Sequence, residues 1–537
     1  MHAKDLIPTM MKTDRVKVNT PKSELLRQTE RIESSLPLAI SYGAELERTA
    51  SSPTTLIDVL INAAKLEDRG IIYVLDNGDE IESSYRQLFG QAKRLLKGLR
   101  KMGIKPQDPV IFQFQKNQNY VPMFWACVLG GYITVPIATS TSYAEKNADT
   151  TKLYNIWNML DKPVIITDED LVKEVNKLSG VWETDEFVIS TAEQLMENDE
   201  EQEFYAYQEE DFVLYLLTSG STGLPKCVQH RNASLVARTM ATAQFNQFDS
   251  EEVLLCWMPL EHVGGLVMYH ILGVYLACQQ ILPRVDSFIS QPLNWLHWMD
   301  KYKATLTWAP NFAFSLVNDQ EKVIEEGSWD LSSVKHILNG GEAIVAKTAK
   351  RFLSILRKHQ LRDDCMYPSF GMSETSSGIV FSKTFRSEPQ SGVHYVDKIS
   401  FETQLRFVDD TEKEHICFTE VGGPIPGVSV RIVDDSNQLL QENHIGRVQV
   451  TGPTIMAGYY QNQEANQEAF IGDGWFFTGD LGFLNEGRLT VTGRQKDIII
   501  MNGKNYYNYE IESLVESVYG VQSTFVLPQR LLIPPKV

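Results

Sequence analysis

The amino-acid sequence predicts an α/β fold with largely parallel sheets. From Thr54 onward, segments with helical periodicity alternate with short strand-like segments. The runs PVIFQF at 109–114 and YITVPIA at 132–138 have the pattern of buried strands on either side of an apolar helix. Alternation of strand and helix is typical of βαβ units, whose strands pair in parallel.

The elements follow in chain order. Residues 55–66 and 84–103 have the spacing of apolar residues expected for helices, and residues 71–81 predict a hairpin with an Asn-Gly turn. The acidic stretch at 182–211 is expected to be a solvated face and loop. Beyond Ile425 strand-like segments dominate, and a further amphipathic element begins at residue 509.

These patterns predict three parts. Residues 1–52 are polar with mixed charge, include a short amphipathic helix over 23–37, and form an N-terminal extension without the apolar stretch of a secretory signal. Residues 53–494 form a large domain. A hinge near 494–497 then leads into residues 495–537, which begin a smaller subdomain.

Composition argues against several classes of partner. The net charge of −19 disfavours broad binding to nucleic acid or to an anionic membrane, because both require a basic face. The six cysteines occur singly and without metal-ligand spacing, as expected for reduced thiols in a cytoplasmic protein. The uncharged run at 262–283 is long enough for a transmembrane helix to be considered. The histidines, the Gly-Gly pair and the Gln-Gln pair that interrupt it favour a buried helix of a soluble protein.

Hydroxyls, glycines and a lysine follow a buried strand in the segment LYLLTSGSTGLPK at 214–226. Hydroxyl and backbone N–H groups donate hydrogen bonds, glycine admits close approach, and lysine adds positive charge, so this composition suits a phosphate chain. The spacing differs from the GxxxxGK[ST] motif of P-loop NTPases, and Pro225 removes one N–H. Taken alone, the segment is also compatible with a flexible turn.

Four further motifs accompany this loop in a fixed order. They are NGGEAI at 339–344, YPSFGMSETSSG at 367–378, GWFFTGDLG at 474–482 and GRQKDIIIMNGKNYYNYEIE at 493–512. Together with TSGSTGLPK, they resemble the motifs of the adenylate-forming superfamily, which includes acyl-CoA synthetases, fatty acyl-AMP ligases and nonribosomal peptide synthetase adenylation domains. The likeness is greatest to fatty acyl-AMP ligase-like loading domains of polyketide and nonribosomal peptide synthases.

The resemblance runs from about residue 53 to the end and implies a fold and a reaction. The implied fold is a large N-terminal domain, with two mostly parallel α/β sheets and a small β-barrel, hinged to an α+β C-terminal domain that is truncated in this chain. The implied reaction is ATP- and Mg²⁺-dependent activation of a carboxylic acid to acyl-AMP, with release of pyrophosphate.

The resemblance also assigns residues to roles in this reaction. The implied catalytic residues are Thr218, Lys226, Ser373 and Glu374, and Glu374 is the implied Mg²⁺ ligand. The implied nucleotide-binding residues are Ser219, Gly220, Ser221, Thr222, Gly223, Gly340, Gly341, Glu342, Phe370, Gly371, Asp480 and Arg494.

The acid is expected to lie beside the segments at 257–266 and 307–316. The implied pocket residues are His262, Val263, Gly264, Trp308, Asn311, Phe312 and Met372. Adenylation domains for α-amino acids carry an aspartate where this chain has Val263, and an ammonium group facing valine would lose its charge partner. We therefore expect an acid without an α-ammonium group: a fatty, aryl, α-hydroxy or α-keto acid.

The segment at 391–420 occupies the place of an extra motif in fatty acyl-AMP ligases, which favours an acyl carrier protein over coenzyme A as the acceptor. By the same resemblance Lys496 lies at the hinge and Gly503 lies in a loop near the pantetheine arm. Relatives supply a late catalytic lysine beyond the hinge, which has no counterpart before Val537. A free-standing acyl-CoA synthetase, or an impaired fragment that binds ATP or adenylate, therefore remain as alternatives.

Overall fold

The computed structural model of the chain describes residues 36–218, 225–412, 414–501 and 504–507. The chain divides into two compact units, Met1–Leu38 and Ala39–Val537. Of the first unit only residues 36–38 are described. The helix predicted over 23–37 therefore lies almost entirely outside the described residues, and the element predicted from residue 509 lies wholly outside them.

One sheet of the second unit has seven strands in the order β20-β9-β8-β5-β4-β6-β7. Its bounds are β4 Pro109–Gln113, β5 Ile133–Pro136, β6 Ile165–Thr167, β7 Ile189–Thr191, β8 Phe212–Thr218, β9 Lys226–Arg231 and β20 Gly458–Tyr459. Strands β4 to β8 pair in parallel, as predicted, whereas β9 turns back antiparallel to β8. The carboxyl end of β8 therefore opens into the predicted phosphate loop.

A second, larger sheet begins with parallel strands. From its edge the order is β3-β2-β11-β10-β12-β13-β14, and only the β2–β3 hairpin among these pairs is antiparallel. The bounds are β2 Gly70–Val74, β3 Glu80–Ser84, β10 Val253–Leu255, β11 Gln279–Pro283, β12 Leu306–Ala309, β13 His336–Asn339 and β14 Met366–Met372. The hairpin predicted around the Asn-Gly turn is confirmed.

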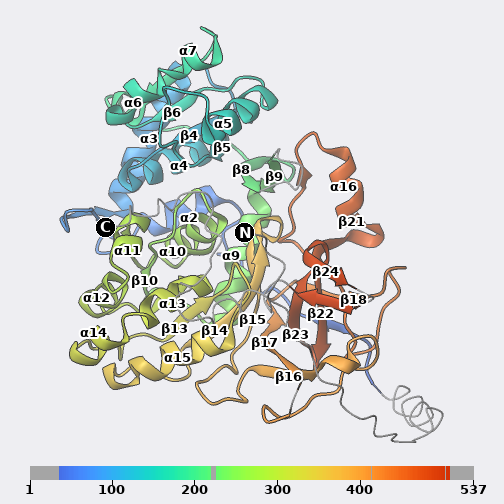
Figure 1. The fold of residues 1–537 in the computed structure, drawn as a ribbon. Helices are drawn as coiled ribbons and strands as arrows, with labels where there is room; N and C mark the ends of the chain where they lie inside the picture. The colour runs from blue at the N-terminus through green and yellow to red at the C-terminus, as the bar shows by residue number, and fades with distance from the viewer. Residues whose placement is uncertain (1–35, 219–224, 413, 502–503, 508–537) are drawn as a thin grey trace, which may run out of the picture. The chain divides into compact units, whose positions relative to one another are not determined.

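Past β14 the same sheet becomes antiparallel. Its remaining bounds are β1 Ile40–Tyr42, β15 Ser377–Phe381, β16 Val393–Asp397, β17 His415–Pro424, β18 Ser429–Val433, β19 Gly446–Thr451, β21 Phe470–Ile471, β22 Trp475–Asn485 and β23 Arg488–Arg494. The strands from β18 onward, at the red end of the colour range in Figure 1, correspond to the β-rich region expected beyond residue 425, whereas β15, β16 and β17 precede it and β1 comes from the N-terminal part of the chain. They join the parallel part through the β14–β15 and β15–β17 pairs, and β1 joins them within the segment predicted as an extension. A short pair, β24 Ile498–Met501 and β25 Lys504–Tyr507, follows β23.

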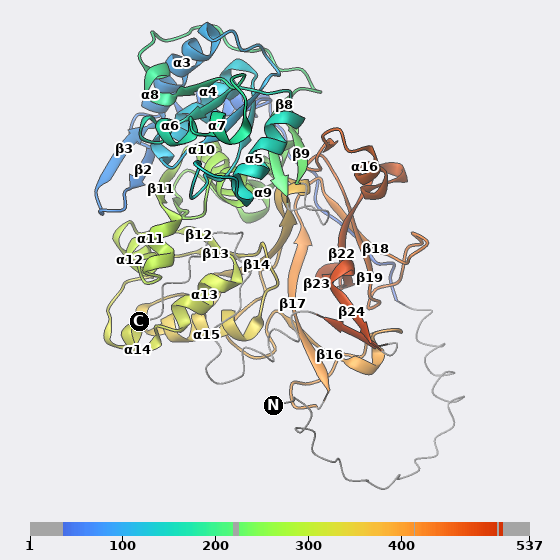
Figure 2. The ribbon, with the colours of Figure 1, turned by 45° about the horizontal axis from the view of Figure 1, so that its top comes forward.

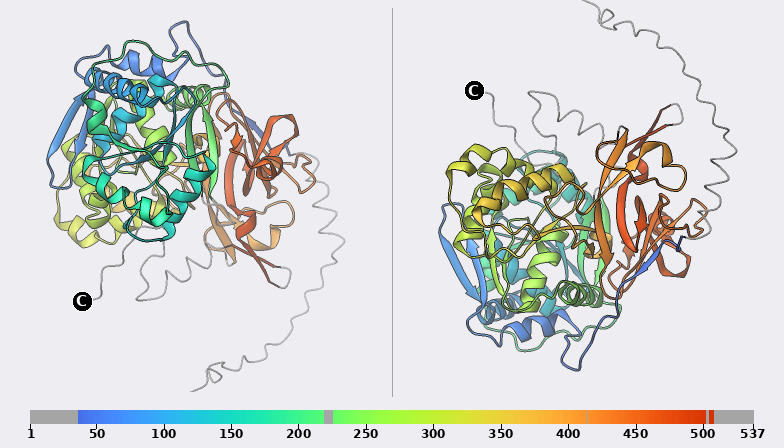
Figure 3. Two further views of the ribbon diagram at one scale, coloured as in Figure 1. Left: turned by 90° about the horizontal axis from the view of Figure 1, so that it is seen from above. Right: turned by 90° about the horizontal axis from the view of Figure 1, so that it is seen from below.

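Helices fill the spaces beside the sheets (Figures 2 and 3). Their bounds are α2 Leu56–Ala63, α3 Tyr85–Lys101, α4 Asn117–Gly130, α5 Ala148–Met159, α6 Glu169–Val175, α7 Leu178–Trp182, α8 Ala192–Met196, α9 Asn232–Asn246, α10 Leu272–Leu276, α11 Val285–Ser290, α12 Asn294–Lys301, α13 Asn311–Asn318, α14 Glu321–Glu326, α15 Ala346–Leu356 and α16 Gln463–Ala469. The largest hydrophobic core joins both sheets through α2, α3, α4, α9 and α10. Separate cores lie under α11–α15 and under α5–α7.

The prediction of one buried helix over the apolar run at 262–283 is only partly confirmed. Its centre is a π-helix, η2 Gly264–Ile271, which α10 continues, but its last residues form the buried strand β11. A run in which most residues are apolar and none is charged does not distinguish a buried helix from a buried strand, so periodicity missed this boundary. Among the described residues, no helix combines the length and the apolar character needed to span a bilayer.

Candidate active site

The predicted phosphate-binding segment connects β8 and β9. Thr218 ends β8 and pairs with Lys226, the first residue of β9. The intervening residues predicted to contact phosphate, Ser219, Gly220, Ser221, Thr222 and Gly223, lie outside the described residues. Because β8 runs parallel to β5, the loop leaves the carboxyl end of the parallel strands, where open α/β sheets bind ligands.

Lys226 and Glu374 meet on opposite parts of one tyrosine. The Lys226 ammonium lies 4.6 Å from the ring centroid of Tyr459, and the Tyr459 hydroxyl donates a 2.8 Å hydrogen bond to Glu374 Oε1. Tyr459 belongs to β20, which pairs with β9 at Val228. Sequence reasoning missed Tyr459; the aromatic pair in MAGYYQ was the signal available.

Glu374 is a buried carboxylate with 5% relative exposure. Burial raises the pKa of Glu374, while the Tyr459 hydrogen bond and the charges of Arg494 and Lys226 lower it in part. A carboxylate in such surroundings favours a cation close by. Among the described residues no group of three His, Cys, Asp or Glu side chains gathers to hold a metal.

The turn that presents Ser373 and Glu374 is tied down on both sides. Thr375 Oγ1 accepts from Met372 N at 3.0 Å, and the Glu374 carbonyl accepts from Met456 N at 2.8 Å. Ser376 follows with φ of 57°, an uncommon backbone conformation for a residue other than glycine. The turn therefore has a fixed geometry before any ligand binds.

The predicted adenine segment follows β13 and lies beside β14. A Cβ on Gly340 would stand 2.5 Å from Ser369 Oγ, and a Cβ on Gly371 would stand 2.1 Å from the Ser377 carbonyl. Gly341 has φ of 88°. These three positions require glycine for close packing or backbone conformation, which agrees with a loop pressed against β14.

Two other residues predicted to contact ligands hold this loop in place. The Glu342 carboxylate accepts a 2.6 Å hydrogen bond from Phe312 N, and Asn311 Oδ1 accepts one of 3.1 Å from Val345 N. Both bonds connect the loop to α13. Half-buried Phe370 packs against the main core. Asn339, which sequence reasoning missed, is fully buried, and neither of its side-chain polar atoms has a partner among the described residues.

The predicted ribose residues lie opposite each other on paired strands. Asp480 of β22 faces Arg494 of β23, and Arg494 Nε lies 3.4 Å from Asp480 Oδ1. The Asp480 side chain is buried, whereas 64% of the Arg494 side chain is exposed. Since Arg494 also lowers the pKa of Glu374, the predicted ribose and metal residues share one electrostatic environment.

The predicted acyl pocket centres on Trp308. The His262 imidazole stacks on Trp308 with centroids 6.1 Å apart and an angle of 14° between the planes. A Cβ on Gly264 would stand 2.4 Å from the Trp308 ring, so this glycine lets the indole lie against η2. His262 is partly open to solvent, but the protein atoms around its ring lower its pKa by displacing water from the charged form. Val263 is buried and Met372 is half-buried.

The two residues predicted beyond the large domain are less informative. Lys496 is exposed in a short 3₁₀ turn after β23, and Gly503 lies outside the described residues. Among the described residues, the structure thus brings Glu374 together with Lys226 and Arg494, and Trp308 together with His262 and Gly264.

The model of the AMP-binding enzyme family matches residues 61–460 of the chain. The chain belongs to this family. This AMP-binding enzyme is 29% identical over 521 residues to atromentin synthetase invA1 of Paxillus involutus, covering 94% of the chain and 51% of that relative. It therefore spans about half the length of the curated relatives it matches.

Solved structures agree with the fold of this AMP-binding enzyme. An adenylation domain of a keto acid-selecting nonribosomal peptide synthetase module, bound to a keto acyl adenylate, is 49% identical with a TM-score of 0.84, covering 91% of this chain and 88% of that one. Fatty acyl-adenylate ligases from E. coli and L. pneumophila are 25% identical with a TM-score of 0.79, covering 89% and 85%. The predicted superfamily and the mixed α/β fold with two sheets are confirmed.

Proposed function

We propose that this AMP-binding enzyme activates an α-keto acid with ATP, forming a keto acyl adenylate and pyrophosphate, and passes the acyl group to a carrier-protein thiol. The observation that carries the proposal is the convergence of Lys226, Glu374 and Arg494. The charges of Lys226 and Arg494 both act on the buried carboxylate of Glu374, and all three side chains come from different strands or turns.

The reaction requires charge stabilisation more than acid–base chemistry. The carboxylate oxygen of the acid attacks the α-phosphorus of ATP, an O–P bond forms, and the bond to the pyrophosphate oxygen breaks. Lys226 is suited to bind the departing phosphates, and Asp480 to accept hydrogen bonds from the ribose hydroxyls. Glu374 is suited to hold Mg²⁺, which when bound supplies positive charge to the phosphate oxygens.

The choice of an α-keto acid rests on Val263 and on the relatives. Val263 is 6% exposed and offers no charge to an α-ammonium group, whose burial without a partner is costly. A keto group in its place is uncharged and needs no counter-ion. The solved relative at 49% identity selects keto acids, whereas the fatty acyl-adenylate ligases share only 25% identity with this chain.

Acid-dependent ATP–pyrophosphate exchange tests this proposal directly. Matched acids with one side chain and an α-keto, α-hydroxy or α-amino group, together with a fatty acid, isolate the contribution of the α-substituent. We expect the keto acid to give the highest kcat/KM and the amino acid the lowest. Preference for the amino or fatty acid would contradict the proposal.

A second assay addresses the acceptor. The adenylate formed in the first step is offered either a phosphopantetheinylated carrier protein or free coenzyme A, and thioester formation is measured for each. We expect thioester on the carrier protein, as the segment at 391–420 predicts. Equal transfer to coenzyme A would instead identify an acyl-CoA synthetase.

A further inference from the structure

Arg238 is a buried cation without a counter-ion. It lies on α9 with no exposed surface. Its Nη1 donates to the Val267 carbonyl at 3.5 Å, and its Nη2 contacts Met268 Sδ. Within the described ranges no carboxylate acts on the charge of Arg238, and its Nε has no hydrogen-bond partner. Burial lowers its pKa to about 9, so the guanidinium remains charged at neutral pH.

Tyr269 is a second buried donor without an acceptor. It also has no exposed surface, and its hydroxyl has no partner among the described residues. The Arg238 guanidinium contacts Met268, the residue that precedes Tyr269 on η2, and its charge lowers the pKa of Tyr269 against the larger, opposite effect of burial. Buried polar groups are nearly always hydrogen-bonded, so two unsatisfied donors together indicate a missing acceptor.

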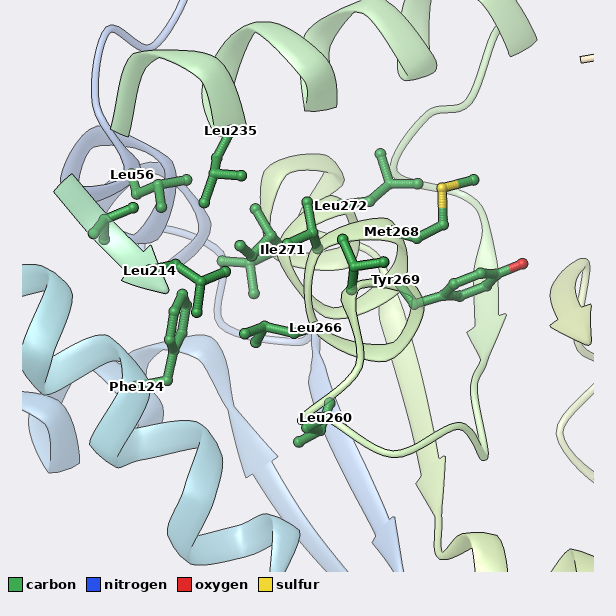
Figure 4. Close-up of a cluster of buried hydrophobic side chains, with 14 of the residues drawn as sticks. Leu56, Phe124, Leu214, Leu235, Leu260, Leu266, Met268, Tyr269, Ile271 and Leu272 are labelled. Carbon is green, nitrogen blue, oxygen red and sulfur yellow. The ribbon is translucent and has the colours of Figure 1, made fainter. Parts of the chain in front are cut away.

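Tyr269 adjoins the predicted acyl pocket, and Arg238 reaches it through Met268. The Tyr269 ring lies 6.2 Å from Trp308, centroid to centroid. A Cβ on Gly378 would stand 3.9 Å from the Met268 methyl group, and Gly378 pairs with Gly371 of the nucleotide motif. Figure 4 shows Met268 and Tyr269 projecting from the same side of η2, away from the core residues on its other side.

We propose that Arg238 and Tyr269 form a polar end of the acyl pocket that binds an oxygen acceptor at the distal end of the substrate's side chain. This inference rests on the proposed function and narrows its substrate class to keto acids whose side chain ends in a carboxylate or a phenolic oxygen. A carboxylate would neutralise the guanidinium, and a phenolic oxygen would accept from either donor.

Met268 is the side chain that a substrate must displace to reach Arg238. Methionine has three rotatable side-chain bonds and a polarizable sulfur, so it adapts to different neighbours at low cost. A substrate oxygen that replaces the sulfur gains a charge-assisted hydrogen bond, which is stronger than the contact it displaces. Arg238 and Tyr269 thus act as specificity-determining residues, separate from the phosphate and metal residues.

Two matched pairs of keto acids test the proposal in the exchange assay. Phenylpyruvate and para-hydroxyphenylpyruvate differ by a phenolic hydroxyl, and α-ketoisocaproate and α-ketoglutarate differ in whether the side chain ends in methyl groups or a carboxylate. We expect the acceptor-bearing member of one pair to be preferred at least about 10-fold, and Tyr269→Phe and Arg238→Met to remove most of that preference. The pair that shows the preference identifies which acceptor the site takes.

Binding of acyl-sulfamoyl adenosine mimics of the same four acids, measured by calorimetry, gives a readout without turnover. Tyr73→Phe is the matched control because Tyr73 of β2 is also a buried tyrosine whose hydroxyl lacks a partner among the described residues. Arg238→Lys retains the charge if Arg238→Met does not fold, and Tyr269→Phe changes only one oxygen.

The outcomes separate this inference from the proposed function. The polar end of the pocket would be overturned if the protein exchanged and bound both members of each pair equally well. It would also be overturned if Tyr269→Phe kept the wild-type preference for the acceptor-bearing acid. Either result would leave keto acid activation intact. Failure of every acid to support exchange, together with failure of every mimic to bind, would overturn both.

Discussion

Gly264→Ala is the sharpest test of the acyl pocket because the clash it creates is defined. An added Cβ would lie 2.4 and 2.5 Å from two Trp308 ring atoms and 3.1 Å from His262 Nδ1. Carbon atoms in contact prefer about 3.5 to 4.0 Å, so the indole must move by roughly 1 Å. The backbone of Gly264 lies outside the left-handed region, so the effect of alanine arises from this contact and not from backbone strain.

The displaced indole has little room. His262 stacks nearly parallel to it, and the Tyr269 ring is a second aromatic neighbour, with centroids 6.2 Å apart. Overpacking of this kind costs about 1 to 3 kcal/mol, which corresponds to about a 5- to 150-fold loss in kcat/KM if the cost falls on acid binding. We expect that loss for keto acids with branched or aromatic side chains, a smaller loss for pyruvate, and an unchanged KM for ATP.

Exchange kinetics with pyruvate and phenylpyruvate measure both effects. Gly180→Ala is the matched control because an added Cβ at Gly180, in α7, would contact nothing within 4 Å. A double-mutant cycle with Trp308→Ala isolates the contact, since removal of the indole should restore tolerance of alanine at 264. Equal kcat/KM for phenylpyruvate in wild type and Gly264→Ala would refute the assignment of Trp308 to the pocket wall.

Three other predictions concern charge. Tyr459→Phe removes a hydrogen bond worth about 1.5 to 3 kcal/mol to ionised Glu374 and so raises the pKa of Glu374 further. Because the ionised form binds Mg²⁺, the acidic limb of the pH profile of exchange should shift to higher pH. An unshifted acidic limb would contradict this prediction. Glu374→Gln should reduce exchange about 100-fold or more. Glu374→Gln should also raise the thermal midpoint of the ligand-free protein by about 1 to 3 °C at neutral pH. Burial raises the pKa of Glu374, so the wild-type protein loses stability as the pH rises above 4.5, the ordinary pKa of a glutamate, and glutamine avoids this loss. In a calorimetric pH series the gain should therefore vanish below pH 4.5. Val263→Asp buries a carboxylate and should lower the free energy of unfolding by about 3 to 5 kcal/mol, as measured by urea unfolding. The variant should also raise exchange with the α-amino acid relative to exchange with its α-keto counterpart. An unchanged ratio of the two exchange rates would show that residue 263 does not face the α-substituent.

Sequence patterns predicted the local features well because those features depend on neighbours in the chain. The hairpin at 71–81 and helix α3 follow from an Asn-Gly turn and from apolar spacing, with Ser84 and Gln87 closing a capping box. The run at 262–283 was harder, because a continuous apolar pattern fits both η2 and β11. The choice between them depends on β2 and β10, which pair with β11 from elsewhere in the chain.

By itself, the sequence determined the superfamily, the α/β class and the residue types available for phosphate, metal and acid, since ordered motifs and glycine positions are read along the chain. Tertiary structure alone decided which of those residues meet. Tyr459 reaches Glu374 across 85 residues, Asp480 faces Arg494 through strand register, and Arg238 of α9 reaches Val267 and Met268 of η2. Such contacts follow from sheet pairing and from burial of apolar faces, which act between distant segments and leave no local periodicity to read.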